Sequence, residues 1–315
     1  RSLLRTSPER VLMIVGPRDN GDGPFASPPN ATHTVVGLVE LHRTPGPAGT
    51  INNLPSLLRE TGATMVSVSD QSLSRDAVLN TVASAGDFAI HFRVPLNVFP
   101  LLRGNPPVRD HEAEHVTLDL GARARGAWVR FGKRAVDVVA PLVILPLAVP
   151  IGCAIACAIW LDSGRPILFP HERIGVKSRR FRMLKFRTMV AGTPALADAP
   201  RTPDDERVTR VGRWLRRWSL DELPQLWNVF SGDMSLVGPR PEMPHLVARY
   251  APWQQMRLWV RPGLTGLWQV LGRKEHPLHE HLEYDVYYVH NVCASLDLAI
   301  LLKTLPRIIG GRGAY

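Results

Sequence analysis

The sequence predicts an α/β chain in two parts: a Rossmann-like domain with its linker over residues 1–127, and a mainly α-helical domain over residues 128–315. Three observations support this division. Short β-rich runs alternate with helical stretches in the first part. The chain then becomes polar and rich in Gly and Arg over residues 110–130, as linkers do. Directly afterwards, residues 138–161 contain no charged side chain, which predicts a membrane helix at about 137–161.

The first part shows the alternation of an α/β sheet. Strands are expected at 11–15, 35–39, 64–68 and 88–92, with an edge strand at 116–120, and helices at 54–60 and 75–85. The glycines between residues 16 and 23 lack the G-x-G-x-x-G spacing that brings a backbone close to a pyrophosphate. A structural or regulatory role is therefore predicted for this part, rather than nucleotide binding.

The apolar run is long enough to cross a bilayer as a helix, at about 1.5 Å per residue against roughly 30 Å of hydrocarbon. Both of its flanks are basic, however, whereas a single span has its positive charge mainly on one side. Pro141, Pro146 and Pro150 also lie within it, and an interior proline kinks a helix. We therefore predict a re-entrant helix, bent near Pro150, that enters and leaves through one leaflet. A spanning helix and a buried core helix are the alternatives.

The charge balance indicates polyanionic partners, because the chain has a formal net charge of +10. Part of this charge lies in residues 207–218, where apolar side chains recur at helical spacing between five arginines. A helix in the interface of an anionic membrane surface has this pattern, and so does a basic helix packed on a protein core. No nucleic-acid recognition motif accompanies the charge, so nucleic acid is not an expected partner.

Two adjacent carboxylates, Asp221 and Glu222, follow the basic stretch. Such a pair repels itself unless a divalent cation or nearby arginines stabilise it, and either arrangement suits phosphoryl chemistry. A solvated helix cap is the ordinary alternative. Three cation-bearing elements elsewhere are candidates for phosphate contacts: Lys185 and Arg187 at strand spacing, Arg240 held between Pro239 and Pro241, and Arg261 at a Gly-containing turn.

The order of these motifs resembles the bacterial sugar transferase family, the monotopic phosphoglycosyl transferases. Six motifs from about residue 130 to the C-terminus carry the resemblance: Lys133-Arg134-x-x-Asp137, Glu172-Arg173-Ile174-Gly175, Lys185-Phe186-Arg187-Thr188-Met189, Leu220-Asp221-Glu222-Leu223-Pro224-Gln225, Val237-Gly238-Pro239-Arg240-Pro241 and Arg261-Pro262-Gly263-Leu264-Thr265-Gly266. The first part also resembles the accessory domain of the family's longer members, which often carry transmembrane helices before it. The chain is therefore expected to be a piece of a longer protein.

The resemblance implies a two-step reaction on a re-entrant membrane helix, with Asp221 and Glu222 as catalytic residues. Asp221 would attack the β-phosphorus of a UDP-sugar, with UDP-glucose or UDP-galactose as the expected donor, and UMP would leave. A polyprenyl phosphate such as undecaprenyl phosphate would then accept the sugar phosphate, as the first membrane step of exopolysaccharide, capsule or O-antigen synthesis. Mg²⁺ is the expected cofactor, held by Asp221 and Glu222. The expected contacts to the nucleotide or phosphates are Lys185, Arg187, Pro239, Arg240, Pro241 and Arg261.

Two alternatives to this covalent route remain. Direct transfer in a ternary complex would use Asp221 as a general base, and a non-enzymatic membrane scaffold or regulator of a polysaccharide assembly complex would need no catalysis. The expected location is the cytoplasmic face of the bacterial inner membrane. The three cysteines agree with a reduced, cytoplasmic setting, since they form neither a disulfide framework nor a metal-binding pair. The oligomeric state is left open, a homo-oligomer included.

Some segments depart from the family pattern or fall outside its motifs. At the bend the family often has Ser-Pro, whereas this chain has Val149-Pro150 and lacks that hydroxyl. Residues 276–281 are rich in histidine, but no further ligand set at metal spacing accompanies them, so a zinc site is not expected. Asp285, Tyr287 and Tyr288 match a family segment and are expected to be structural or to border the site.

Overall fold

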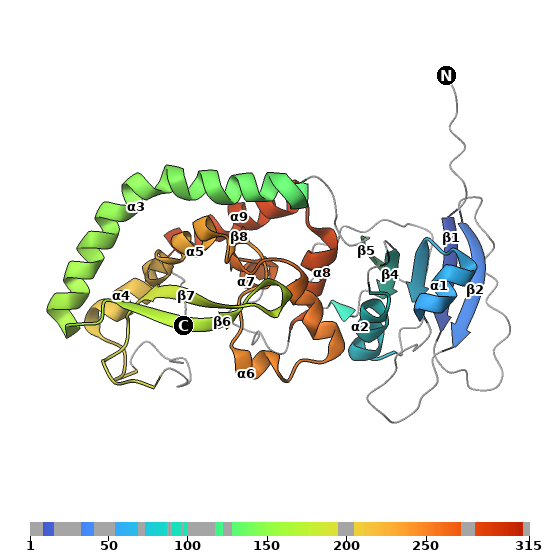
Figure 1. Cartoon of the computed structure of the whole chain (residues 1–315), viewed down its shortest axis with the longest axis horizontal. Helices are drawn as coiled ribbons and strands as arrows, with labels where there is room; N and C mark the ends of the chain where they lie inside the picture. The colour runs from blue at the N-terminus through green and yellow to red at the C-terminus, as the bar shows by residue number, and fades with distance from the viewer. Residues whose placement is uncertain are drawn as a thin grey trace, which may run out of the picture. The chain divides into compact units, whose positions relative to one another are not determined.

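The computed structural model shows two compact units, unit 1 comprising residues 1–124, 251–256 and 289–291, and unit 2 comprising the remaining residues. Figure 1 labels the helices and strands of both units. The structure describes residues 9–15, 33–40, 54–68, 73–86, 88, 90–95, 98–99, 117–121, 128–194, 205–271 and 281–310.

Unit 1 contains a five-stranded sheet in the order β2-β1-β3-β4-β5, in which the first four strands are parallel and β5 is antiparallel. The strands are β1 (Glu9–Val15), β2 (His33–Glu40), β3 (Met65–Val68), β4 (His91–Pro95) and β5 (Thr117–Leu120). The five predicted strands are confirmed, although the fourth begins later than residue 88. The chain first turns at Gly86, where φ is +58°, and Phe88 N donates to Ala85 O.

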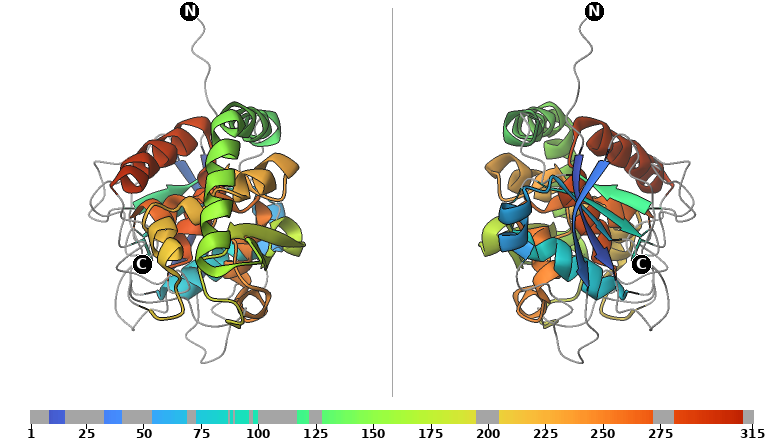
Figure 2. Two further views of the ribbon diagram at one scale, coloured as in Figure 1. Left: turned by 90° about the vertical axis from the view of Figure 1, so that its left-hand side faces the viewer. Right: turned by 90° about the vertical axis from the view of Figure 1, so that its right-hand side faces the viewer.

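Two helices accompany the sheet, α1 (Leu54–Thr61) and α2 (Arg75–Ser84), as the sequence predicts. Helix α1 lies in the connection from β2 to β3, and α2 lies in the connection from β3 to β4. Both connections move in the same direction along the sheet, and right-handed crossovers of this kind place both helices on one face (Figure 2). Buried aliphatic residues of the inner strands, among them Ile14, Val66 and Val94, form the core. The connection between β1 and β2, with the glycines of residues 16–23, lies outside the described residues, so a Rossmann-like arrangement stays a prediction.

Unit 2 combines helices with a long hairpin and a short parallel strand pair. The helices are η3 (Trp128–Gly132), α3 (Lys133–Ser163), η4 (Val176–Ser178), α4 (Arg210–Arg217), η5 (Leu220–Glu222), α5 (Gln225–Ser231), α6 (Pro244–Val247), η6 (Pro252–Trp259), α7 (Leu267–Leu271), α8 (Glu283–Asn291) and α9 (Ala294–Ile309), of which η6 and α8 also extend into unit 1. The strands are β6 (Leu168–Ile174) paired antiparallel with β7 (Arg180–Phe186), and β8 (Ser235–Val237) paired parallel with β9 (Gly263–Thr265).

The apolar run forms α3, a helix of 31 residues that bends between two arms (Figures 1 and 2). Three prolines lie inside it, and each removes a backbone donor, which accounts for the bend. By length and composition α3 is able to cross a membrane, and only 17% of its most apolar window is buried within the protein. That degree of exposure does not fit the buried core helix that the sequence left as an alternative.

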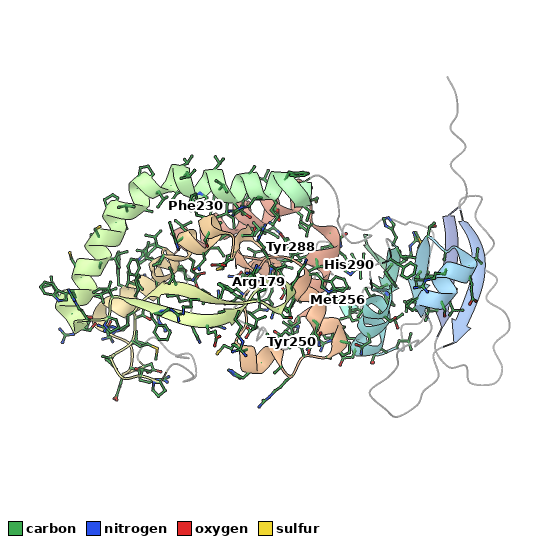
Figure 3. The ribbon with its side chains drawn as sticks, in the orientation of Figure 1. Arg179, Phe230, Tyr250, Met256, Tyr288 and His290 are labelled. Atoms are coloured by element: carbon green, nitrogen blue, oxygen red, sulfur yellow. The ribbon has the colours of Figure 1, made fainter. Side chains whose placement is uncertain are left out.

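Three charged residues fasten the first turns of α3 to the rest of unit 2. Lys133 Nζ donates to Asp297 Oδ2 at 2.9 Å and Tyr288 Oη at 3.0 Å. Arg134 caps the C-terminus of α5 by donating to the carbonyls of Val229 and Phe230 at 2.9 and 2.8 Å. The motif Lys133-Arg134-x-x-Asp137 is completed by Asp137, whose Oδ1 accepts hydrogen bonds from Ser235 Oγ at 3.0 Å and Leu236 N at 2.9 Å. Each charged residue of the motif thus binds a different element. Figure 3 shows Tyr288 below the first arm of α3.

Helix α4 packs on the second arm of α3 through its aliphatic side. Leu215 is fully buried in a cluster with Ile155, Ile159 and Phe186, and Val211 packs against that cluster. Asp162 Oδ2 accepts from Val211 N at 3.1 Å and so caps the start of α4. The sequence left two interpretations of this stretch, a membrane-interface helix and a helix packed on a protein core. The aliphatic side of α4 fits the second, because it is packed on the core. The exposed side presents arginines and Trp214, which is 54% exposed.

Candidate active site

The carboxylate pair lies in a tight connection between two helices. Ser219, which lies between α4 and η5, has a left-handed backbone (φ 56°), and Asp221 and Glu222 follow in the 3-10 turn η5. Leu220 and Leu223, on either side of the pair, pack against the cluster shared by α3 and α4. Asp221 and Glu222 are consequently only 5% and 8% exposed, which does not fit a solvated helix cap.

Two predicted cations contact the pair from different elements. Lys185 Nζ, on β7, lies 2.9 Å from Glu222 Oε1 and 3.7 Å from Asp221 Oδ2. Arg240 Nη2 donates to the same Glu222 oxygen at 3.2 Å. The side chains of Lys185 and Arg240 keep 20% and 25% of their surface exposed, so a phosphate arriving from solvent is able to reach both.

Asp221 lies in a buried, charged environment that leaves one of its carboxylate oxygens without a hydrogen-bond donor. Burial raises the pKa of Asp221, the charge of Lys185 lowers it, and the charge of Glu222 raises it again. Asp221 Oδ1 is buried and accepts no hydrogen bond from any described residue. A carboxylate oxygen with no donor to stabilise it is a better nucleophile, or a better metal ligand, than a fully hydrogen-bonded one.

Backbone pairing brings together the fifth and sixth motifs, residues 237–241 and 261–266. Gly238 N donates to Thr265 O and Gly263 N donates to Pro239 O, each at 2.8 Å, beside the paired strands β8 and β9. The strands approach so closely that a Cβ on Gly263 would lie 2.1 Å from Gly238 N. Only glycine fits at residue 263, because a larger side chain has no space there. The backbone hydrogen bonds of Gly238 and Pro239 hold the start of the loop that carries Arg240.

Arg187 and Arg261 have other partners. Arg187 is buried and donates through Nη2 to the carbonyls of Ser163 and Gly164, both at 2.8 Å, which caps the end of α3. It leaves the face of Lys185 because β7 ends at Phe186, so strand alternation no longer holds at residue 187. Burial raises the pKa of Asp137 at the start of α3, and the charge of Arg261 is among the smaller effects that lower it. The structure therefore groups Lys185 and Arg240 with the carboxylates and gives Arg187 a helix-capping contact.

Sequence reasoning missed the contacts that two arginines make with the Arg240 loop. Arg257 is buried and lies in no motif, whereas Arg173 lies in a family motif but was given no role. Arg257 forms an ion pair with Asp285, whose Oδ2 lies 2.8 Å from Arg257 Nη2, and Arg173 Nη1 donates to Pro241 O at 3.4 Å. For Arg257 the sequence signal was weak, because it is a single arginine within the aromatic and apolar stretch of η6. Asp285 and Tyr288, expected to be structural or to border the site, make buried contacts with Arg257 and with the Lys133–Asp297 pair.

The residues at the pair suit Mg²⁺. No cluster of three or more His, Cys, Asp or Glu side chains able to hold a metal occurs among the described residues. Mg²⁺ characteristically uses one or two carboxylates together with substrate phosphates, and Asp221 and Glu222 would supply such a pair. The histidine-rich stretch lies largely outside the described residues, and its last member, His281, contacts Glu283 at 3.0 Å.

Comparison with known proteins places this site within one family. Residues 128–311 match the family model described as bacterial sugar transferase. The chain belongs to this family. The match includes every predicted site residue, from Lys185 to Arg261, and leaves unit 1 largely outside it.

Similar proteins include transferases that act on lipid carriers. The chain is 37% identical over 266 residues to a UDP-galactose-lipid carrier transferase of Erwinia amylovora, covering 78% of this chain and 54% of the relative. It is 39% identical over 201 residues to an undecaprenyl-phosphate galactose phosphotransferase of Salmonella typhimurium, covering 59% and 42%. It is 38% identical over 224 residues to a UDP-glucose:undecaprenyl-phosphate glucose-1-phosphate transferase of Caulobacter vibrioides, covering 68% and 83%. The chain spans about half the length of the first two relatives.

Proposed function

We propose that this chain transfers a hexose-1-phosphate from a UDP-sugar to undecaprenyl phosphate and releases UMP. The observation that carries the proposal is the buried Asp221 with one unpartnered oxygen, beside Lys185 and Glu222. The relatives' names supply the substrate class, with UDP-glucose or UDP-galactose as donor. The product would enter exopolysaccharide, capsule or O-antigen synthesis.

The proposed reaction has two displacements at one phosphorus atom. A carboxylate oxygen of Asp221 bonds to the β-phosphorus of the donor, the bond from that phosphorus to the bridging oxygen breaks, and UMP leaves with the bridging oxygen. An oxygen of undecaprenyl phosphate then attacks the same phosphorus, and the Asp221 carboxylate is released. Lys185 and Arg240, which contact the carboxylate pair, would stabilise the phosphoryl oxygens in both steps.

Mg²⁺, held by Asp221 and Glu222, would neutralise charge on the diphosphate and on the departing UMP. Glu222 also has a role of its own, because its Oε1 accepts from both Lys185 and Arg240. It therefore holds the two cations side by side before the donor arrives, which lowers the cost of ordering them in the complex.

A membrane surface is the proposed location, because the lipid acceptor keeps its phosphate at headgroup level. The bend of α3 and its exposed apolar side chains support a re-entrant insertion that leaves both ends on the cytoplasmic side (Figure 1). Helix α9 adds exposed Leu298, Leu302 and Leu305 on one side, while Asp297 and Thr304 bind the protein. Helix α4 packs near the C-terminal end of α3, and its exposed arginines would attract the anionic headgroups of the membrane.

The function is tested by incubating the purified chain in lipid nanodiscs with undecaprenyl phosphate, Mg²⁺ and a panel of UDP-sugars. We expect UMP release with UDP-glucose or UDP-galactose and formation of a lipid-linked sugar diphosphate. Absence of UMP release with every donor would contradict the enzyme and favour a scaffold or regulator. The panel also identifies the sugar, which depends on hydrogen bonds to individual hydroxyls.

Substitution of Lys185 by Met is expected to move the acid limb of the pH–rate profile to higher pH. Lys185 contributes the largest charge effect that lowers the pKa of Asp221, and Asp221 must be ionised to attack. Removing the ammonium group therefore raises that pKa further, and activity is lost at a less acidic pH. The measurement is kcat/KM against pH at one fixed Mg²⁺ concentration. An acid limb at the wild-type position would contradict this role, and Lys303→Met, an exposed site on α9, is the control.

A further inference from the structure

Arg257 is a deeply buried arginine that belongs to none of the predicted motifs. It is 3% exposed, and its guanidinium has three partners from separate segments. Nη2 lies 2.8 Å from Asp285 Oδ2 and donates to the carbonyl of Arg240 at 2.5 Å, while Nη1 donates to the hydroxyl of Tyr250. Tyr250 itself follows α6 (Figure 3). A charge buried to this extent requires such partners, so its position is fixed by all of them.

The partner of greatest consequence is the carbonyl of Arg240. The carbonyl oxygen of Arg240 accepts a hydrogen bond from Arg257, while Nη2 of the Arg240 side chain donates to Glu222 Oε1 at 3.2 Å. Arg173 approaches the next residue, with Nη1 3.4 Å from Pro241 O. The flanking prolines restrict the backbone further, so the direction of the Arg240 side chain depends on where these carbonyls are held.

We infer that Arg257, oriented by Asp285, is a positioning residue that holds the Arg240 loop so that the Arg240 guanidinium points at the carboxylate pair. Its kinetic consequence rests on the proposed transferase function, whereas its effect on the loop does not. An arginine is required because a planar fork serves the Arg240 carbonyl and the Tyr250 hydroxyl together, whereas an ammonium group offers a single point of charge. Asp285 contributes the opposite charge that keeps the fork in place.

The loop is tested first without any reaction, by hydrogen–deuterium exchange of the full chain in nanodiscs. We expect Arg257→Lys to speed exchange in peptides covering residues 236–243, with little change in peptides of β6 and β7. Arg249→Lys, an exposed arginine just after α6, is the matched control and should leave the loop unchanged. Unchanged exchange of residues 236–243 in Arg257→Lys would overturn the inference. Tyr250→Phe, which removes one partner and no charge, carries the same test if Arg257→Lys does not fold.

A double-mutant cycle then separates positioning from general damage. We expect Arg257→Lys to lower kcat/KM for the UDP-sugar about 10-fold in the wild-type background and under about 2-fold in the Arg240→Ala background. Equal losses in both backgrounds would show that Arg257 acts independently of Arg240 and would overturn the inference. A wild-type chain that releases no UMP would refute the proposed function instead, and the exchange result would still decide whether Arg257 holds the loop.

Discussion

Asp221→Asn is expected to abolish UMP release, with a loss of at least about 10³-fold in kcat. The amide has almost the same shape as the carboxylate but cannot form the acyl phosphate of the proposed intermediate. Among the described carboxylates only Glu222 lies beside it, and Glu222 is engaged by Lys185 and Arg240. The measurement is UMP release per enzyme at saturating donor and acceptor. Because Asp221 is buried, the free energy of unfolding should be measured in parallel.

The matched control for this substitution is Asp233→Asn. Asp233 is an exposed aspartate just after α5, where it accepts a hydrogen bond from Ser231. We expect wild-type activity in this variant. UMP release by Asp221→Asn at a rate within about 10-fold of the wild type would contradict the catalytic assignment, because loss of a nucleophile costs far more.

Glu222→Gln is expected to lower kcat/KM about 10²-fold and to raise the Mg²⁺ concentration needed for half-maximal activity. The substitution removes a carboxylate that is both a candidate metal ligand and the shared acceptor of Lys185 and Arg240. With its charge gone, the two cations repel each other and no longer share one oxygen. A Mg²⁺ titration of wild type and variant, at fixed ionic strength, measures the effect.

The two roles of Glu222 are separable by comparison with Arg240→Ala. Both variants disrupt the cation pair, but only Glu222→Gln removes a candidate metal ligand. We therefore expect the Mg²⁺ requirement to change in Glu222→Gln and to stay near the wild-type value in Arg240→Ala. An unchanged Mg²⁺ requirement in both variants would contradict the assignment of Glu222 to the metal.

Local sequence patterns were sufficient for much of the architecture. The β-rich runs of unit 1 and the apolar run of α3 carry their signal within a few consecutive residues, and the structure has strands and a helix at those places. The ordered motifs singled out Asp221, Glu222, Lys185 and Arg240 by residue types that suit phosphate chemistry, and the structure adds that the two cations contact the carboxylate pair. In these cases, short-range periodicity and residue chemistry determine the outcome.

Predictions were less successful where tertiary contacts decide. Strand spacing grouped Arg187 with Lys185, but the strand ends one residue earlier and the end of α3 accepts the Arg187 guanidinium. Helical spacing placed Trp214 and Leu215 together on an apolar face, whereas Leu215 is buried and Trp214 exposed. Arg257 had no motif at all, because its importance lies in partners that are distant in sequence, such as Asp285. Contacts of this kind are specified by the fold rather than by local pattern.

The covalent intermediate is tested most directly by trapping it. Wild-type chain is mixed with UDP-sugar labelled in the β-phosphate, with Mg²⁺ and without lipid acceptor, then quenched rapidly and digested for mass spectrometry. We expect close to one label per chain on the peptide containing Asp221, with one UMP released, and loss of the label when undecaprenyl phosphate is added before quenching. A chain that turns over with acceptor present but carries no label in its absence would contradict the covalent route and support direct transfer.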